Sequence, residues 1–342
     1  MNKVLRLEIT DKCNYRCDMC WSKKWKHKDL EYFVLEKMIA EYAKIEPNGC
    51  IVLTSREPLL SKNFIPILEL ATKLNLDIKV LSNCSLLSPS ICEAIINNNV
   101  SFISTSIHGT REEHDEIVHV KGAYDATIKG LELLNSYRKK YNKNLEIRVT
   151  TLFRKSLLNN INSILDLTTK LDLTLRIQHM MWHPVEIQKL NRELINEKYG
   201  YVDDIIDGFP NKTDLNGKEA LKLLKTIRDL NKEYHNIQVY PELYDDELIS
   251  WYDDTTRVNK NNYCDHSSNS IRIRANGDVT FCQYIDKTFG NINNQTLDEI
   301  IYNNKEYNDI CKSFENGEML PICYRCCHCR SKIKKFKNNE KI

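Results

Sequence analysis

The sequence predicts an α/β fold, in which a partial (β/α)6 TIM-like barrel is followed by a helical connector and a small cysteine-rich C-terminal domain. Three observations support this fold class. Short β-branched runs alternate with longer amphipathic stretches, six strand runs occur where a closed barrel needs eight, and cysteines gather near both ends. A chain of 342 residues is long enough for one large domain and a smaller one.

The predicted strands and helices alternate from the N-terminus. Strands are expected over residues 4–10, 50–54, 77–82, 101–107, 145–153 and 174–180. Helices are expected over residues 33–43, 65–74, 89–98, 124–141 and 158–171. Since helices separate the strands, the sheet should be parallel with right-handed crossovers, and ligands should bind at the carboxyl ends of its strands.

The domain boundaries follow changes in composition. We expect the barrel over residues 1–182, a helical connector or lid over 183–262, a cysteine-rich domain over 263–330 and a basic tail over 331–342. Within the cysteine-rich part, strands over 270–274 and 278–281 bracket an Asn276-Gly277 turn.

Composition excludes some classes of protein. The formal net charge is +2, with 42% hydrophobic and 28% charged residues, so nothing suggests nucleic acid or an anionic membrane as a partner. No apolar run is long enough to span a bilayer or to form a signal peptide, and we expect a cytoplasmic protein. In a reducing compartment, thirteen cysteines point to metal sites more than to disulfides.

Three cysteines lie together directly after the first predicted strand. Cys13, Cys17 and Cys20 fall on a loop that can wrap around one face of an iron–sulfur cube, because iron favours thiolate ligands. Zinc normally takes a fourth protein ligand, and no neighbouring residue fits its usual spacings. Buried structural cysteines do not ordinarily cluster in one short loop.

This triplet, with the neighbouring Thr10 and Asn14, resembles the radical S-adenosylmethionine (SAM) superfamily. The resemblance implies a 4Fe–4S cluster held by three thiolates, with SAM bound at the open iron. It implies reductive cleavage of SAM to a 5'-deoxyadenosyl radical that abstracts hydrogen from the substrate. An electron donor such as flavodoxin or ferredoxin is implied as well.

Later strand ends resemble the SAM-binding positions of the family. Ser55, Arg56 and Glu57 stand where the family carries Gly-Gly-Glu before proline, and the replaced glycines put the close backbone approach to SAM in question. Asn83 resembles the family's ribose contact, whereas Cys84 stands where glycine is usual.

The resemblance implies further SAM contacts at Met19, Ser106 and Arg148, in addition to Ser55, Glu57 and Asn83. Arg148 is a plausible bidentate partner of the SAM carboxylate, and Arg56 could also pair with a carboxylate of SAM or of the substrate. Cys84 is a candidate hydrogen donor to a substrate radical, although core packing is the simpler interpretation. Each of these side chains could instead be a structural polar group whose hydrogen bonds are made within the protein.

The C-terminal cysteines predict a second metal site. Cys264 and Cys282 flank the expected hairpin, and Cys323 and Cys326 follow downstream. Their order is similar to the SPASM and twitch extensions, which implies an auxiliary 4Fe–4S cluster, and one complete set of four favours the shorter twitch form. A four-cysteine zinc site remains an alternative. Cys327 or Cys329 could take the place of Cys326, and together with Cys311 they could support another metal, although packing behind the ligands is the simpler interpretation.

The substrate is less well defined by the sequence. Relatives with this layout commonly modify peptides, so a peptide is the leading expectation, with a cyclitol, sugar or other small metabolite as the alternative. A non-catalytic iron–sulfur or zinc protein is a third possibility. Few residues precede Cys13, so we expect no leader-binding domain there. Residues 178–184 are a candidate substrate contact or plain packing.

Overall fold

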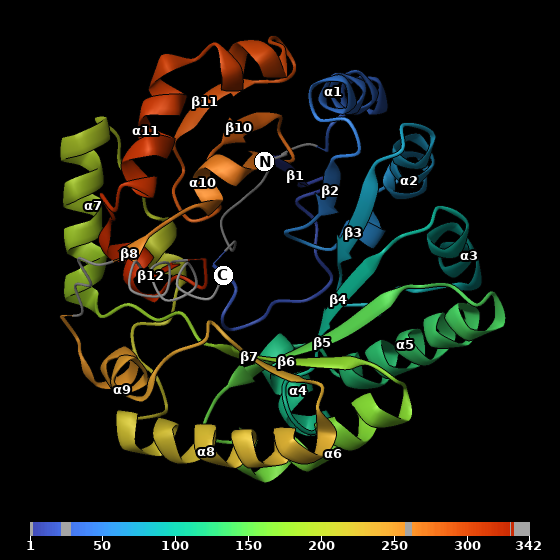
Figure 1. Ribbon diagram of the computed structural model, residues 1–342, viewed down its shortest axis with the longest axis vertical. Helices are drawn as coiled ribbons and strands as arrows, with labels where there is room; N and C mark the ends of the chain where they lie inside the picture. Colours follow the sequence, from blue (N-terminus) through green and yellow to red (C-terminus); the bar gives the residue numbers. More distant parts are fainter. Residues whose placement is uncertain (1–2, 22–28, 257–261, 329, 332–342) are drawn as a thin grey trace, which may run out of the picture.

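The computed structural model describes residues 3–21, 29–256, 262–328 and 330–331. Figure 1 shows strands curving around an interior with helices outside them. The barrel elements are β1 (Val4–Leu7), α1 (Tyr32–Ile45), β2 (Cys50–Leu53), α2 (Phe64–Lys73), β3 (Asp77–Leu81), α3 (Pro89–Asn97), β4 (Phe102–Ser106), α4 (Arg111–Val118), α5 (Ala123–Lys140), β5 (Glu146–Phe153), α6 (Leu157–Lys170) and β6 (Thr174–His179).

The second half continues with α7 (Val185–Tyr199), α8 (Gly217–Tyr234), β7 (Ile237–Tyr240), α9 (Asp245–Asp253), β8 (Asn262–Tyr263), α10 (His266–Asn269), β9 (Ser270–Ile273), β10 (Asp278–Thr280), β11 (Thr288–Asn291), α11 (Lys305–Glu315) and β12 (Arg330–Ser331). Strands β8 and β12 form a separate antiparallel pair.

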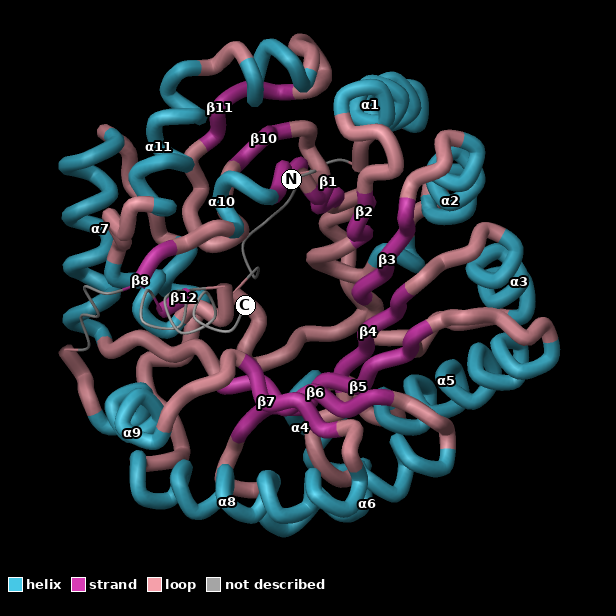
Figure 2. The backbone as a smooth tube through the Cα atoms, in the orientation of Figure 1, coloured by secondary structure: helices cyan, strands magenta, loops and turns pink. Residues whose placement is uncertain are grey.

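One ten-stranded sheet organises the described part of the chain. Its strand order is β11-β10-β9-β1-β2-β3-β4-β5-β6-β7. Strands β1 to β7 and β9 are parallel, whereas β10 and β11 are antiparallel additions. The edge strands β7 and β11 do not pair with each other, and Figure 2 shows helices around the outer face. The predicted partial barrel is therefore confirmed.

Alternating burial explains how the strands form. In β1 and β5 every second side chain is buried, and most of these are apolar residues packed against the helices, among them Leu5, Leu7, Ile147 and Val149. The intervening side chains are partly buried and face the barrel interior, since successive strand residues point to opposite faces. The β-branched runs noted in the sequence thus mark these strands correctly.

Local capping explains where the helices begin. Helix α3 starts after Ser88, whose hydroxyl accepts a hydrogen bond from the Ile91 N–H at 3.3 Å, with Pro89 in the first turn. Helix α4 has a reciprocal capping box between Thr110 and Glu113. The sequence prediction missed α4 because this short, charged helix buries little apolar surface.

Two long-range pairings differ from the expected layout. Strand β7 lies inside the segment predicted to be a helical connector, where it pairs in parallel with β6 through Ile177 and Val239. Strand β9 of the cysteine-rich part pairs in parallel with β1 through Leu5 and Ile271. The sheet therefore runs across the boundary predicted at residue 263. No helix in the described ranges is long and apolar enough to cross a membrane.

Candidate active site

The N-terminal cysteine loop leaves the carboxyl end of β1 and is held by backbone hydrogen bonds on both sides. The Glu57 N–H donates to the Lys12 carbonyl at 3.0 Å, which ties the loop to the end of β2. The N–H groups of Arg16 and Asp18 donate to the last carbonyls of α4, each at 3.0 Å. The thiols therefore sit on a fixed loop at the strand ends, where the sequence predicts the ligand.

Tyr15 anchors the same loop to helix α5. Its ring is buried, and its hydroxyl lies 3.2 Å from the Ala123 carbonyl and 3.1 Å from the Thr127 hydroxyl. The Thr127 hydroxyl in turn donates to the carbonyl of Asn83 at 3.0 Å. One buried aromatic residue thus connects the cysteine loop, α5 and the end of β3.

The three thiols of the loop lie close enough to influence one another. Burial, together with the neighbouring Cys20 and Cys13, raises the pKa of Cys17 to about 12. Cys13 is exposed and Cys17 and Cys20 are partly exposed, so the thiols have an open side. Three soft donors with mutual repulsion and an open side fit an iron–sulfur cluster, which would remove the repulsion by binding all three as thiolates.

Glu57 joins the ends of β2 and β3. Its carboxylate is buried and accepts hydrogen bonds from the Ser82 hydroxyl at 2.7 Å, the Asn83 N–H at 2.7 Å and the Leu59 N–H at 3.0 Å. Burial raises the pKa of Glu57, and these three donors act in the opposite direction. Glu57 therefore holds together the loops after β2 and β3, where the sequence predicts contacts with SAM.

The backbone keeps a glycine-like shape at two positions where the chain lacks glycine. Ser55 has φ of 77° and Cys84 has φ of 61°, both in the left-handed region. The Ser55 hydroxyl is buried and has no hydrogen-bond partner among the described residues. An orphaned polar atom beside the cysteine loop is what a missing ligand would leave, which supports Ser55 as a SAM contact.

Asn83 also contacts the cysteine loop directly. Its side-chain N–H donates to the Asn14 side chain at 2.8 Å, and its side-chain oxygen accepts from the Ser85 N–H at 2.9 Å. Asn14 donates in turn to the Ser85 hydroxyl at 2.9 Å. The predicted ribose contact is therefore also part of the support for the loop.

The remaining predicted SAM contacts are distributed unevenly. Met19 packs against the small apolar cluster that contains Tyr15 and Val118. Ser106 is the last residue of β4 and is partly buried at the strand end. Cys84 is completely buried in the main core, and burial raises its pKa to about 12, which agrees with a packing role.

Arg148 is not brought to the cysteine loop. It lies near the amino end of β5, where it donates to Glu146 at 2.6 Å and its guanidinium carbon lies 4.5 Å from the centre of the Phe102 ring. Arg56, in contrast, lies close enough to the cysteine loop to act on Cys13. Its Nε is buried without a hydrogen-bond partner among the described residues. Burial raises the pKa of Cys13, and the nearby Arg56 lowers it.

The C-terminal cysteines meet at one cavity. Its lining includes all four predicted ligands, Cys264, Cys282, Cys323 and Cys326, together with His266 and His328. The two histidine rings are stacked with their centres 4.0 Å apart. Across the described residues, no three His, Cys, Asp or Glu side chains converge on a point where one metal ion would sit.

Backbone N–H groups already point at two of these sulfurs. The Tyr284 N–H donates to the Cys282 sulfur at 3.3 Å, and the His328 N–H donates to the Cys326 sulfur at 3.4 Å. Such hydrogen bonds stabilise thiolate ligands of iron–sulfur clusters. The cavity and its donors therefore fit the predicted auxiliary cluster.

Two other C-terminal cysteines, Cys311 and Cys327, are not among the described residues that line this cavity. Cys311 is buried on α11, and its sulfur contacts the Ser267 carbonyl at 3.2 Å. Cys327 is buried next to the cavity, and Cys329 lies outside the described residues.

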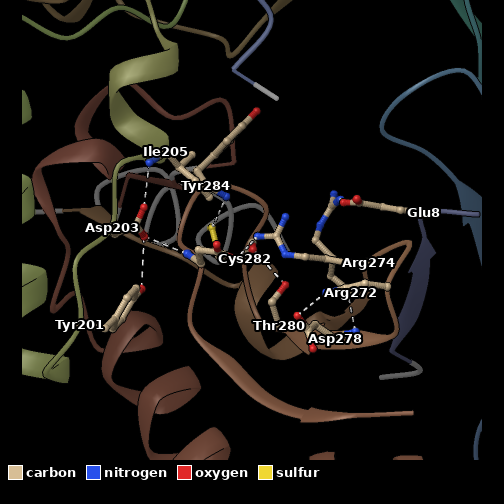
Figure 3. Close-up of polar contacts among 12 residues, drawn as sticks. Glu8, Tyr201, Asp203, Ile205, Arg272, Arg274, Asp278, Thr280, Cys282 and Tyr284 are labelled. Carbon is tan, nitrogen blue, oxygen red and sulfur yellow. Dashed lines mark hydrogen bonds and ion pairs between the residues drawn. The ribbon is translucent and has the colours of Figure 1, made fainter. Parts of the chain in front are cut away.

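Buried charged residues link the end of β1 to the second cysteine site (Figure 3). Arg272 on β9 is 2% exposed and donates to Glu8, directly after β1, at 2.7 Å and to Gln283 at 2.7 Å. Gln283 follows Cys282, so this arginine spans from the strand before the first cysteine loop to the second site. No local pattern in the sequence signals this pairing, because Glu8 and Arg272 lie 264 positions apart.

The connector also contacts the second site. Buried Asp203 accepts hydrogen bonds from the Ile205 N–H at 2.9 Å and the Asp286 N–H at 2.8 Å. Arg274 pairs with the Asp286 side chain at 3.1 Å. The pKa of Asp286 is raised to about 6, mainly by burial. Arg274 opposes this rise, and Asp203 adds to it. The loop after Cys282 is thereby fixed from two sides.

The candidate substrate segment after β6 is well packed. The His179 ring lies 2.9 Å from the Tyr252 hydroxyl, and Trp182 lies under the guanidinium of Arg325 at 4.1 Å. Arg325 stands between Cys323 and Cys326 and donates to the Trp251 carbonyl at 2.8 Å. These contacts favour the packing interpretation and identify Arg325 as a residue that the sequence analysis missed.

Two family models match these two sites. The radical SAM superfamily model matches residues 7–150, and the SPASM iron–sulfur cluster-binding domain model matches residues 264–327. The first segment carries the N-terminal cysteine loop, and the second carries the C-terminal cavity. The chain therefore belongs to the radical SAM superfamily and has a C-terminal SPASM domain.

Relatives within this superfamily differ in function. The AdoMet-dependent heme synthase of Methanosarcina barkeri is 28% identical over 136 residues, 39% of this chain and 39% of that protein. The match therefore spans well under half of the heme synthase. The GTP 3',8-cyclase of Clostridium botulinum is 24% identical over 237 residues, 66% of this chain and 70% of the cyclase.

Among solved structures, Streptococcus suis SuiB bound to its precursor peptide SuiA has a TM-score of 0.64 at 15% identity. The likeness covers 95% of this chain and 71% of SuiB and shows a shared fold. The two matched domains indicate the cofactors of this protein, which are SAM and 4Fe–4S clusters.

Proposed function

We propose that this radical SAM enzyme abstracts hydrogen from a peptide and thereby modifies it. The observation that carries the proposal is a rigid three-cysteine loop at the mouth of an open barrel, with a second four-cysteine cavity joined to the same sheet. When bound, the first cluster and SAM supply the 5'-deoxyadenosyl radical that starts the chemistry.

The protein's own residues hold and shield this site. Cys13, Cys17 and Cys20 would ligate the first cluster, while Tyr15 and Glu57 keep their loop in place. Ser55 and Arg56 offer buried polar atoms that have no partner among the described residues, and they suit the polar end of SAM. Met19, Asn83 and Ser106 stay predicted SAM contacts.

The second cavity would hold an auxiliary 4Fe–4S cluster through Cys264, Cys282, Cys323 and Cys326. The SuiB likeness supports the peptide assignment, because that structure contains a precursor peptide. An external one-electron donor such as flavodoxin or ferredoxin would reduce the first cluster.

Anaerobic reconstitution with iron and sulfide, followed by reduction with SAM present, tests this proposal. We expect release of 5'-deoxyadenosine, and we expect Cys13→Ala, Cys17→Ala or Cys20→Ala to abolish it. The matched control is Cys92→Ala, which removes a buried thiol from helix α3 far along the chain from both sites. Failure of the reconstituted wild type to release 5'-deoxyadenosine would support a non-catalytic metal protein instead.

A small metabolite is the second candidate substrate. The GTP 3',8-cyclase relative favours it, since the sequence match covers two thirds of this chain. Deuterium transfer from labelled substrate into 5'-deoxyadenosine separates the candidates. A short precursor peptide encoded next to this chain should be the deuterium donor if the peptide assignment is correct, whereas transfer from a nucleotide or cyclitol would replace that assignment.

A further inference from the structure

Arginine side chains occupy interior-facing positions on several strands of the barrel. Arg6 lies on β1 between the helix-facing Leu5 and Leu7, and Arg176 lies on β6 between the helix-facing Leu175 and Ile177. Because strand side chains alternate between faces, both guanidinium groups point into the barrel. Tyr240 and Cys327 interact electrostatically with both arginines, so Arg6 and Arg176 lie in the same region of the barrel interior.

The charge of Arg6 has no counterpart among the described residues. Its Nε is buried without a hydrogen-bond partner, and no described carboxylate forms an ion pair with it. Its direct neighbour across the β1–β9 pair is Arg272, another cation, whose own partner is Glu8. Burial, together with the neighbouring Arg272, lowers the pKa of Arg6 to about 10.

Arg176 is in a similar position. Its Nε is buried and unpartnered among the described residues, and its guanidinium carbon lies 4.6 Å from the centre of the Tyr240 ring. Burial and the nearby Arg148 lower its pKa, whereas Tyr240, Cys327 and the more distant carboxylate of Glu146, which pairs with Arg148, act in the opposite direction. Arg148 is compensated by Glu146 at 2.6 Å, at the partly exposed end of the sheet.

Arg6 and Arg176 are partly buried, and the Nε of each is fully enclosed. Withdrawing a guanidinium from water carries a desolvation penalty that a hydrogen-bonded anion offsets. Three other titratable groups act on Arg6, and none of them is a carboxylate. They are the thiols of Cys50 and Cys327 and the phenol of Tyr240. An arrangement of this kind is typical of a site completed by an anionic ligand.

We propose that Arg6 and Arg176 bind an oxyanion of the substrate, a carboxylate or a phosphate, inside the barrel. This inference rests on the proposed function, because it assigns the anion to the molecule from which hydrogen is removed. Strand β1 leads directly into the cysteine loop, so the anion would lie deeper in the barrel than the thiols. The substrate would then be held by its charged group with its reactive part directed to the strand ends.

Anion binding can be measured on the reconstituted holoenzyme through its unfolding midpoint at constant ionic strength. The probes are inorganic phosphate, N-acetylglutamate for a carboxylate, and N-acetylglutamine as its uncharged counterpart. We expect a saturable rise of the midpoint with phosphate or N-acetylglutamate and no rise with N-acetylglutamine. The anion that acts at lower concentration identifies the chemical source.

The variants Arg6→Gln and Arg176→Gln should weaken binding of the effective probe by about tenfold or more, because each removes a charged hydrogen-bond donor. Arg6→Lys keeps the charge and should retain part of the binding if Arg6→Gln fails to fold. The control is Arg228→Gln. Arg228 lies on the outer helix α8 and forms an exposed ion pair with Asp245, so this variant removes the same charge outside the barrel and should bind the probe as the wild type does.

Equal shifts with N-acetylglutamate and N-acetylglutamine, or unchanged binding in both arginine variants, would overturn the proposal. So would the absence of any anion effect in the wild type together with loss of iron in Arg6→Gln, because the arginines would then balance the charge of a cluster. Release of 5'-deoxyadenosine is assayed on the same preparation. Anion binding without that release would refute the proposed function and leave the anion site standing.

Discussion

At the scale of single residues, the site holds two side chains in a backbone conformation that favours glycine. Ser55 and Cys84 stand where the family usually carries glycine, and both adopt positive φ. A non-glycine residue in this conformation costs about 1–2 kcal/mol. The local shape is therefore imposed by its surroundings, chiefly the buried carboxylate of Glu57 and the loop that it organises.

Replacing Ser55 tests this strain directly. We expect Ser55→Gly to unfold at higher urea concentration than Ser55→Ala, with a difference of about 1 kcal/mol, because glycine relaxes the backbone and alanine does not. Both variants lack the orphaned hydroxyl, so the comparison isolates the conformational effect. Equal stability of the two variants would show that the backbone at this position is unstrained. Both should bind SAM more weakly than the wild type if Ser55 is a contact.

At the residue scale, motif positions predicted part of the site and not the rest. The motif positions of Ser55, Glu57 and Asn83 all came to the strand ends beside the cysteine loop. Arg148 did not, because its position along β5 depends on where the strand begins relative to its neighbours. Arg56 has an unpartnered buried nitrogen beside Cys13 and takes its place as the candidate for the SAM carboxylate.

At the scale of elements, helix α5 is fitted closely to the loop after β3. Gly130 lies where an added Cβ would be 2.1 Å from the Cys84 carbonyl oxygen. Only a residue without a side chain allows this approach without a shift of the backbone. The contact fixes α5, which also carries the Thr127 hydroxyl that binds Tyr15 and Asn83.

The variant Gly130→Ala should therefore destabilise the protein by about 1–3 kcal/mol, even though alanine favours helix formation. Chemical denaturation monitored by circular dichroism measures the change. Ser136→Ala serves as the control, since Ser136 is exposed on the same helix and the substitution adds no clash. A stabilised Gly130→Ala protein would mean that α5 and the loop can separate freely.

The secondary structure itself was largely predictable. All six barrel strands and the five predicted helices appear within a few residues of their expected bounds, because alternating and helical apolar periods are local properties. Helix α4 and strand β7 were missed for opposite reasons. α4 is short and charged, and β7 becomes a strand through its pairing with β6.

At the scale of the whole molecule, the SPASM region continues the barrel sheet. Strand β9 pairs with β1, and the buried Arg272–Glu8 ion pair reinforces this junction. The first cysteine loop and the second cavity are thus attached to adjacent strands of one sheet. Their relative position is set by a strand pair and not by a flexible linker.

This ion pair should contribute strongly to the junction. We expect Arg272→Gln alone or Glu8→Gln alone to cost about 3–5 kcal/mol of unfolding free energy, because each leaves an uncompensated buried charge. The double variant should be more stable than the sum of the two losses predicts. Urea unfolding of all four proteins completes the cycle, and strictly additive losses would mean that the pair contributes no coupling.

The sequence by itself determined the cysteine loop, the strand and helix periods and the four cysteines that line the second cavity. Tertiary structure decided that β9 lies beside β1, that Arg148 lies away from the cysteine loop, and that Arg6 and Arg176 face a common interior. Spacing along the chain encodes contacts among near neighbours. Contacts between distant segments depend on which strands become adjacent and in what register, and that follows from burial of the whole sheet.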